Sequence, residues 1–107
     1  MCRTLKSMAA ILLLGMGTAS AQEPGDPAHG LALARSLCAS CHVVGPDQLG
    51  PVPDGVPSFE TIAATPGMDA AMIEARLIRP QHPQMPTPPL DRQQTRDVVA
   101  YILSLGP

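Results

Sequence analysis

Cys38-Ala39-Ser40-Cys41-His42 is the stretch that decides how this chain is interpreted, because its five residues form the pattern C-x-x-C-H. Two thiols at this spacing can add across the two vinyl groups of one haem and form thioether bonds. The histidine that follows directly is then placed under the iron, where it can serve as the proximal ligand. The pentapeptide therefore predicts one covalent haem c attached through Cys38 and Cys41, with His42 as a ligand of the iron.

Two other functions of a close cysteine pair fit this sequence less well. A structural zinc site needs a second pair of Cys or His ligands, and the sequence contains no such pair. A thioredoxin-like redox pair follows a strand in a βαβ framework, whereas a helical pattern precedes Cys38. The residues around the pentapeptide thus favour haem attachment.

The N-terminal 21 residues have the order of a cleaved secretory signal peptide. Arg3 and Lys6 form a short basic region, residues 8–17 are apolar, and Ala19-Ser20-Ala21 is an A-x-A cleavage site. The apolar stretch is too short to span a bilayer as a helix, which argues against the alternative of an uncleaved membrane anchor. We therefore predict export to the periplasm, removal of residues 1–21 and no stable membrane span afterwards.

Residues 22–107, the predicted mature chain, are expected to form one small domain with few large side chains for its core. Removing 21 of the 107 residues leaves 86, and a domain of about that size buries only about 60% of the surface of its unfolded chain. Phe59 is the only Phe, Tyr101 is the only Tyr, and there is no Trp. A large apolar cofactor would fill the centre that these side chains cannot fill.

The predicted mature chain is acidic and contains no lysine. Five arginines stand against nine acidic residues, a net charge of −4, because the single lysine, Lys6, lies in the predicted signal peptide. Nucleic-acid binding depends on clustered basic charge. The composition therefore predicts no nucleic-acid partner.

Helical patterns separated by proline-rich loops predict an all-α fold. Three main helices and one short one are expected to begin near residues 26, 59, 69 and 91. Asp26-Pro27 is an N-cap residue followed by proline, and Asp91 with Gln94 forms a capping-box pattern. The apolar face of the first helix is expected to run from Gly30 into the cysteine pair, and His29 on its first turn is expected to be solvated. Residues 43–57 and 81–89 carry four prolines each and are expected to be loops.

This layout resembles the small bacterial class I cytochromes c, and the resemblance covers essentially the whole mature chain. In that family a glycine eight residues before the first haem cysteine packs against an aromatic residue of the C-terminal helix, and Gly30 and Tyr101 match these positions. Without a Cβ, Gly30 would let the two helices cross closely. Ala34 departs from the family, in which many members carry an aromatic residue there. The resemblance implies a cytochrome c fold wrapped around one covalently bound haem.

The resemblance also implies a methionine as the distal iron ligand. In the family this residue lies in a proline-bounded loop between the middle and last helices, and Met85, within His82-Pro83-Gln84-Met85-Pro86, matches it. Prolines stiffen the loop and so reduce the entropy cost of ordering a weak thioether ligand. Two alternatives remain, His82 as the ligand and an open distal site. Met68 and Met72 are expected to be packing residues.

Two further expectations concern groups around the haem. In the family, the other ring nitrogen of the proximal histidine donates to a proline carbonyl in the following loop, and both Pro51 and Pro57 could accept from His42. Either Arg76 or Arg79, at the end of the middle helix, could pair with a haem propionate.

Six-coordinate iron has no position left for a substrate and predicts one-electron transfer. Histidine and methionine ligation raises the reduction potential, and the sequence shows no separate catalytic motif. We therefore expect an exported one-electron carrier, not an enzyme, whose partners are redox proteins such as a donor dehydrogenase or reductase and an acceptor oxidase. Two alternatives remain open: a five-coordinate haem enzyme or gas sensor, and a haem relay subunit of a larger oxidoreductase.

The surface that meets these partners is expected to differ from that of many class I cytochromes c. Those proteins dock through a ring of lysines around the haem edge, which a lysine-free mature chain cannot build. We hypothesise docking through a mostly apolar, proline-rich rim around Met85 and Pro86, against a partner that is neutral or basic there.

Overall fold

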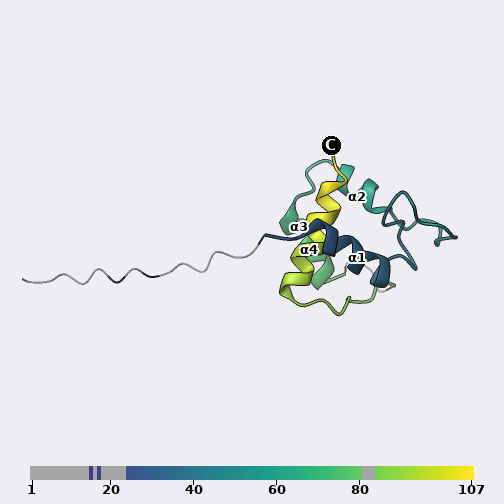
Figure 1. Cartoon of the computed structure of the whole chain (residues 1–107). Coiled ribbons are helices and arrows are strands. Elements are labelled where there is room, and N and C mark those ends of the chain that lie inside the picture. Colours follow the sequence, from purple (N-terminus) through teal and green to yellow (C-terminus); the bar gives the residue numbers. More distant parts are fainter. Residues whose placement is uncertain (1–14, 16, 18–23, 81–83) are drawn as a thin grey trace, which may run out of the picture.

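The computed structural model describes residues 15, 17, 24–80 and 84–107, so His82 and all of the predicted signal peptide except Gly15 and Gly17 lie outside the described residues. In these ranges the chain forms four helices and no strand: α1 (Pro27–Leu37), α2 (Phe59–Ala64), α3 (Ala70–Ile78) and α4 (Arg92–Ser104) (Figure 1). No helix within the described ranges is both long enough and apolar enough to cross a membrane. The predicted all-α fold, with a short helix before the middle one, is confirmed.

Each helix begins at a side chain that accepts a hydrogen bond from a backbone N–H of its first turn. The capping residues are Asp26, Ser58, Asp69 and Asp91. At α4 the cap is reciprocal: Asp91 accepts from the Gln94 N–H at 2.8 Å, and the Gln94 side chain accepts from the Asp91 N–H at 3.0 Å. Such caps satisfy donors that have no partner within the helix. The predicted helix starts are confirmed because they depend on contacts between near neighbours.

Helices α1 and α4 cross each other (Figure 1), and a glycine lies at the crossing. A Cβ built on Gly30 would lie 2.0 Å from the Asp97 carbonyl oxygen and 2.8 Å from the Tyr101 Cβ. Gly25, just before α1, meets α4 in the same way, because a Cβ there would lie 2.2 Å from the Arg96 carbonyl oxygen. Neither position has room for a side chain, so the glycines let the backbones touch. The expected packing of Gly30 against Tyr101 is confirmed.

The small core is built around the crossing of α1 and α4 and includes both aromatic residues. Its buried apolar side chains are Ala34, Val44, Phe59, Ile73, Leu77, Val98, Val99, Tyr101 and Ile102. The ring centres of Phe59 and Tyr101 lie 6.3 Å apart, and the Tyr101 hydroxyl donates to the Val44 carbonyl oxygen. Burial raises the pKa of Tyr101, so its hydroxyl remains a donor. This hydrogen bond ties the loop that follows the pentapeptide to α4.

The apolar face of α1 is shorter than its spacing predicts. Gly30 and Ala34 are buried, but Leu37 is 39% exposed and Cys41 is also exposed. The prediction that the face continues into the cysteine pair is wrong for these two residues. Helix α1 ends at Leu37 with Cys38 as its C-cap, and the helical period no longer decides which way later side chains point.

A buried carboxylate holds the start of α1 against α4. Asp97 accepts from the Asp26 N–H at 2.8 Å and from the Gln93 side chain at 3.0 Å, and its Oδ2 lies 2.6 Å from His29 Nδ1. Burial of Asp97 opposes its ionisation, but these three partners outweigh that effect and hold its pKa below the usual value. His29 is exposed, as expected, and its contact with Asp97 is one that the sequence did not predict.

Replacing Asp97 by Asn is expected to lower the free energy of unfolding by about 1 to 3 kcal/mol near neutral pH, because the ionised acceptor is lost. Since the pKa of Asp97 is lowered in the folded state, its carboxylate stabilises the fold above the usual Asp pKa of about 3.9, and this stabilisation is lost as the pH falls through the lowered value. Urea unfolding of Asp97→Asn and of the original chain at a series of pH values measures the difference between their free energies of unfolding. The exposed Asp54→Asn variant is the control. If the free energies of unfolding of Asp97→Asn and the original chain differed as much near pH 2 as at neutral pH, the Asp97 carboxylate would not be the source of this stabilisation.

Candidate functional site

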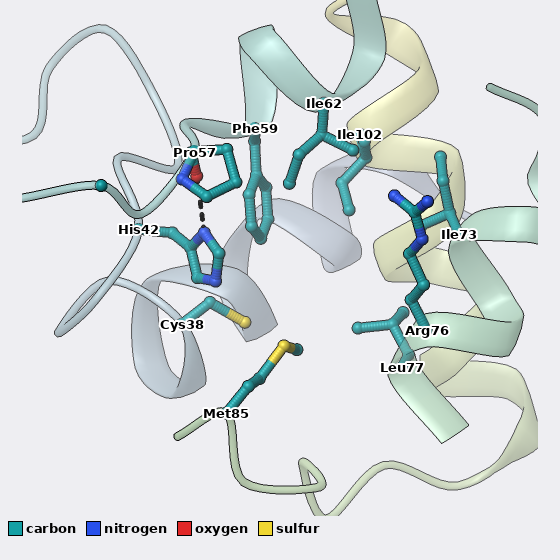
Figure 2. A pocket seen from close by; sticks show the side chains of 11 residues that line it. Cys38, His42, Pro57, Phe59, Ile62, Ile73, Arg76, Leu77, Met85 and Ile102 are labelled. Carbon is teal, nitrogen blue, oxygen red and sulfur yellow. Dashed lines mark hydrogen bonds between the residues drawn. The ribbon is translucent and has the colours of Figure 1, made fainter. Parts of the chain in front are cut away.

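A mostly apolar cavity of about 370 Å³ lies beside the core. Its wall is formed by Cys38, His42, Gly55, Pro57, Phe59, Ile62, Ile73, Arg76, Leu77, Met85 and Ile102. These residues come from all four helices or the segments next to them, and Figure 2 shows their side chains around one shared space. The fold therefore builds the cavity from segments far apart in the sequence.

Three of the four predicted haem-binding residues meet at this cavity. Cys38, at the C-terminal end of α1, and His42 line one part of the wall, and Met85 reaches it from the loop between α3 and α4. In Figure 2 the Cys38 sulfur, the His42 ring and the Met85 sulfur converge on the same space. No disulfide joins Cys38 and Cys41, and burial raises the pKa of the Cys38 thiol. Cys41 is exposed and does not line the cavity.

A backbone carbonyl sets the orientation of the His42 ring. Nδ1 of His42 lies 2.7 Å from the Pro57 carbonyl oxygen (Figure 2), and because a carbonyl can only accept, Nδ1 carries the proton. Nε2 is then the nitrogen available to bind iron. The Phe59 ring packs beside the imidazole, with ring centres 5.5 Å apart. Of the two prolines that could accept this bond, the structure selects Pro57 and not Pro51.

The fold places Met68 and Met72 in different surroundings, and it does the same for Arg76 and Arg79. Met68, like Met85, packs against the core, which confirms its expected packing role. Met72 is 41% exposed, so the same expectation for it is wrong. Arg76 lines the cavity and its side chain extends along the wall in Figure 2, whereas Arg79 is the C-cap of α3 and does not line it.

Gln48 supports the site from outside the cavity wall and was not among the residues predicted from the sequence. Its Nε2 donates to the carbonyl oxygens of Ala39, at 3.0 Å, and His42, at 2.8 Å. Its Oε1 accepts from the Val44 N–H at 2.8 Å. A single glutamine in a loop belongs to no motif and no period, so the sequence carried no signal for it.

The side chains of this cavity fit a haem better than a zinc ion. Apolar walls suit a porphyrin, and a thiol, an imidazole with an available Nε2 and a thioether are the groups that c-type haems use. Among the residues that the structure describes, no three His, Cys, Asp or Glu side chains gather closely enough to hold a metal ion. A structural zinc site needs more ligands than the pentapeptide supplies.

Comparisons with known proteins agree with this chemistry. The family model described as Cytochrome c matches residues 27–106. Cytochrome c-552 of Bradyrhizobium diazoefficiens is 39% identical over 103 residues, which cover 96% of this chain and 96% of that protein. The match spans the pentapeptide, all four helices and the Met85 loop. The chain therefore belongs to the cytochrome c family, and its cofactor is covalently attached haem c.

Proposed function

We propose that this cytochrome c is exported and carries single electrons between redox proteins through a six-coordinate haem. Cys38 and Cys41 would attach the haem, and His42 and Met85 would bind its iron. The observation that carries the proposal is the meeting of Cys38, His42 and Met85 at one apolar cavity. The family match supports electron transfer as the function, and the order of residues 1–21 supports export.

Each side chain has a separate task in this proposal. Haem c, when bound, supplies the Fe(III)/Fe(II) couple. The Cys38 and Cys41 thioether bonds keep the cofactor attached, while Pro57 holds His42 so that Nε2 faces the cavity. Met85 offers a soft thioether, which favours Fe(II) and raises the potential. With His42 and Met85 both bound to the iron, no coordination position would be open to a substrate.

The visible spectrum of the periplasmic protein tests this assignment. We expect the far-red band of methionine sulfur bound to Fe(III), slow binding of carbon monoxide to the reduced form, and a mass equal to residues 22–107 plus one haem. Rapid carbon monoxide binding would instead indicate a five-coordinate enzyme or sensor. Co-purification with a dehydrogenase or oxidase in fixed ratio would indicate a relay subunit.

Docking to redox partners is proposed to use the rim around Met85 and Pro86. Met85 lies at the cavity, Pro86 is exposed beside it, and the mature chain has no lysine. We expect electron transfer to a partner to slow less than about tenfold between low and physiological salt, because few charge pairs are available to be screened. Stopped-flow rates over a salt series measure this. A steep decline would indicate docking through a charged patch.

Arg76 is proposed to pair with a haem propionate, because its side chain lines the cavity although the residue is exposed overall. Arg76→Gln should then lower the reduction potential by some tens of millivolts, since loss of a nearby cation favours Fe(III), and about 59 mV corresponds to a tenfold change for one electron. Redox titration measures the shift, and Arg79→Gln is the matched control. Equal shifts in the two variants would show that overall charge, and not a specific pair, is responsible.

A further inference from the structure

We infer that Gln48 is a positioning residue for the proximal side of the haem, because its side-chain amide holds the backbone that carries Cys41 and His42 in one conformation. The inference rests on the proposed ligation by His42. Gln48 does not line the cavity. Instead, it binds the backbone of residues 38–42, the attachment segment, through the carbonyls of Ala39 and His42.

The attachment segment has no regular secondary structure of its own after α1 ends. Its N–H groups turn back toward the helix: Ala39 donates to the Ala34 carbonyl at 3.1 Å, and His42 donates to the Cys38 carbonyl at 2.9 Å. These bonds leave the carbonyls of Ala39 and His42 facing the following loop. Gln48 accounts for both of them, at 3.0 and 2.8 Å. The Gln48 side chain therefore binds the backbone on both sides of Cys41, at Ala39 and at His42.

The requirement for a glutamine amide is specific. The three bonds use both amide N–H groups and the amide oxygen, which accepts from Val44. A carboxylate of the same shape could accept from Val44 but has no proton to donate. It would also place an oxygen against the carbonyl oxygens of Ala39 and His42. A side chain of the same length without polar atoms could make none of the bonds.

The loop that bears Gln48 is itself anchored in the core. Val44 is 2% exposed, donates its N–H to Gln48 and accepts from the Tyr101 hydroxyl of α4. His42 is thus held at two points, its main chain through Gln48 and its ring through Pro57. Two fixed points define both the position and the rotation of the imidazole, whereas Pro57 alone defines only the rotation. A ligand fixed in this way has little to rearrange when the iron changes oxidation state.

The first test compares Gln48→Glu and Gln48→Leu in the haem-loaded protein. Both should shift the haem-methyl resonances of the oxidised form, which report the orientation of the proximal imidazole, and should lower the yield of attached haem. Leu49→Ala is the matched control, because Leu49 is the adjacent residue and is 95% exposed; it should leave both unchanged. If Gln48→Glu keeps the original haem-methyl pattern, the two donated bonds do not position His42 and the inference is wrong, even if the unfolding midpoint falls.

The second test needs no variant and therefore does not depend on whether the variants fold. The side-chain NH₂ protons of Gln48 should exchange with solvent at least tenfold more slowly than those of Gln84, which is exposed. Equal exchange rates would overturn the inference. Failure of the proposed function looks different, since the original protein would then lack the spectrum of a low-spin c-type haem before any Gln48 variant was made.

Discussion

Replacing Met85 by Ala is expected to abolish the far-red band of the oxidised protein and to open the iron to carbon monoxide. Met85 reaches the cavity from the loop between α3 and α4, and its thioether lines the cavity wall together with His42. Loss of a soft ligand also destabilises Fe(II). The reduction potential should therefore fall by on the order of 0.1 V, a fraction of the roughly 0.8 V over which axial ligands tune haem iron.

Met68→Ala is the control for this experiment, because Met68 packs against the core but does not line the cavity. It should retain the far-red band and the potential while losing some stability. Comparing Met85→Ala with His82→Ala separates the alternatives for the distal ligand. If His82 binds the iron, Met85→Ala keeps a six-coordinate spectrum and His82→Ala loses it. If the distal site is open, neither substitution changes carbon monoxide binding.

Replacing Gly30 by Ala is expected to cost about 2 to 5 kcal/mol of the free energy of unfolding. The added Cβ would lie 2.0 Å from the Asp97 carbonyl oxygen, and a backbone atom cannot turn aside as a flexible side chain can. Alanine is the better helix former by about 1 kcal/mol, so any net loss measures the clash. Because small domains are stable by only about 5 to 15 kcal/mol, a loss of this size removes a large share of the stability.

Chemical unfolding followed by circular dichroism and by haem absorbance measures this loss. Gly106→Ala is the matched control, because a Cβ there would meet its nearest atoms at 3.4 Å, an ordinary contact. It should change the midpoint little. A Gly30→Ala protein as stable as the original would mean that α1 and α4 do not meet at this glycine.

The residues at the crossing of α1 and α4 and the residues that line the cavity belong to the same core. A substitution in one of these regions is therefore expected to affect the other. Phe59 lies between the two regions: its ring centre is 5.5 Å from that of His42 and 6.3 Å from that of Tyr101. Tyr101 also packs against Gly30. Displacing α4 by Gly30→Ala should therefore disturb the His42 side of the cavity as well as the fold.

Much of the fold could be predicted because it depends on short-range patterns. Helix starts follow from caps such as Asp26 and Asp91, whose partners lie two or three residues away. The attachment motif is five residues long, and its chemistry depends on residue type and spacing alone. The closeness of Gly30 to Tyr101 came from the family resemblance, since no local pattern links residues that lie so far apart in the sequence.

Other contacts were decided by the tertiary structure alone. They join residues that loops bring together, and no local sequence pattern specifies the path of a loop. The choice of Pro57 over Pro51 and the pairing of His29 with Asp97 both depend on how such a segment folds back. Helix α1 ends before Cys41, so the helical period did not predict the direction of that side chain. The pentapeptide by itself predicted that a haem could be attached and through which atoms. The fold determined how its histidine is held, since an imidazole can be fixed only by partners that the rest of the chain brings to it.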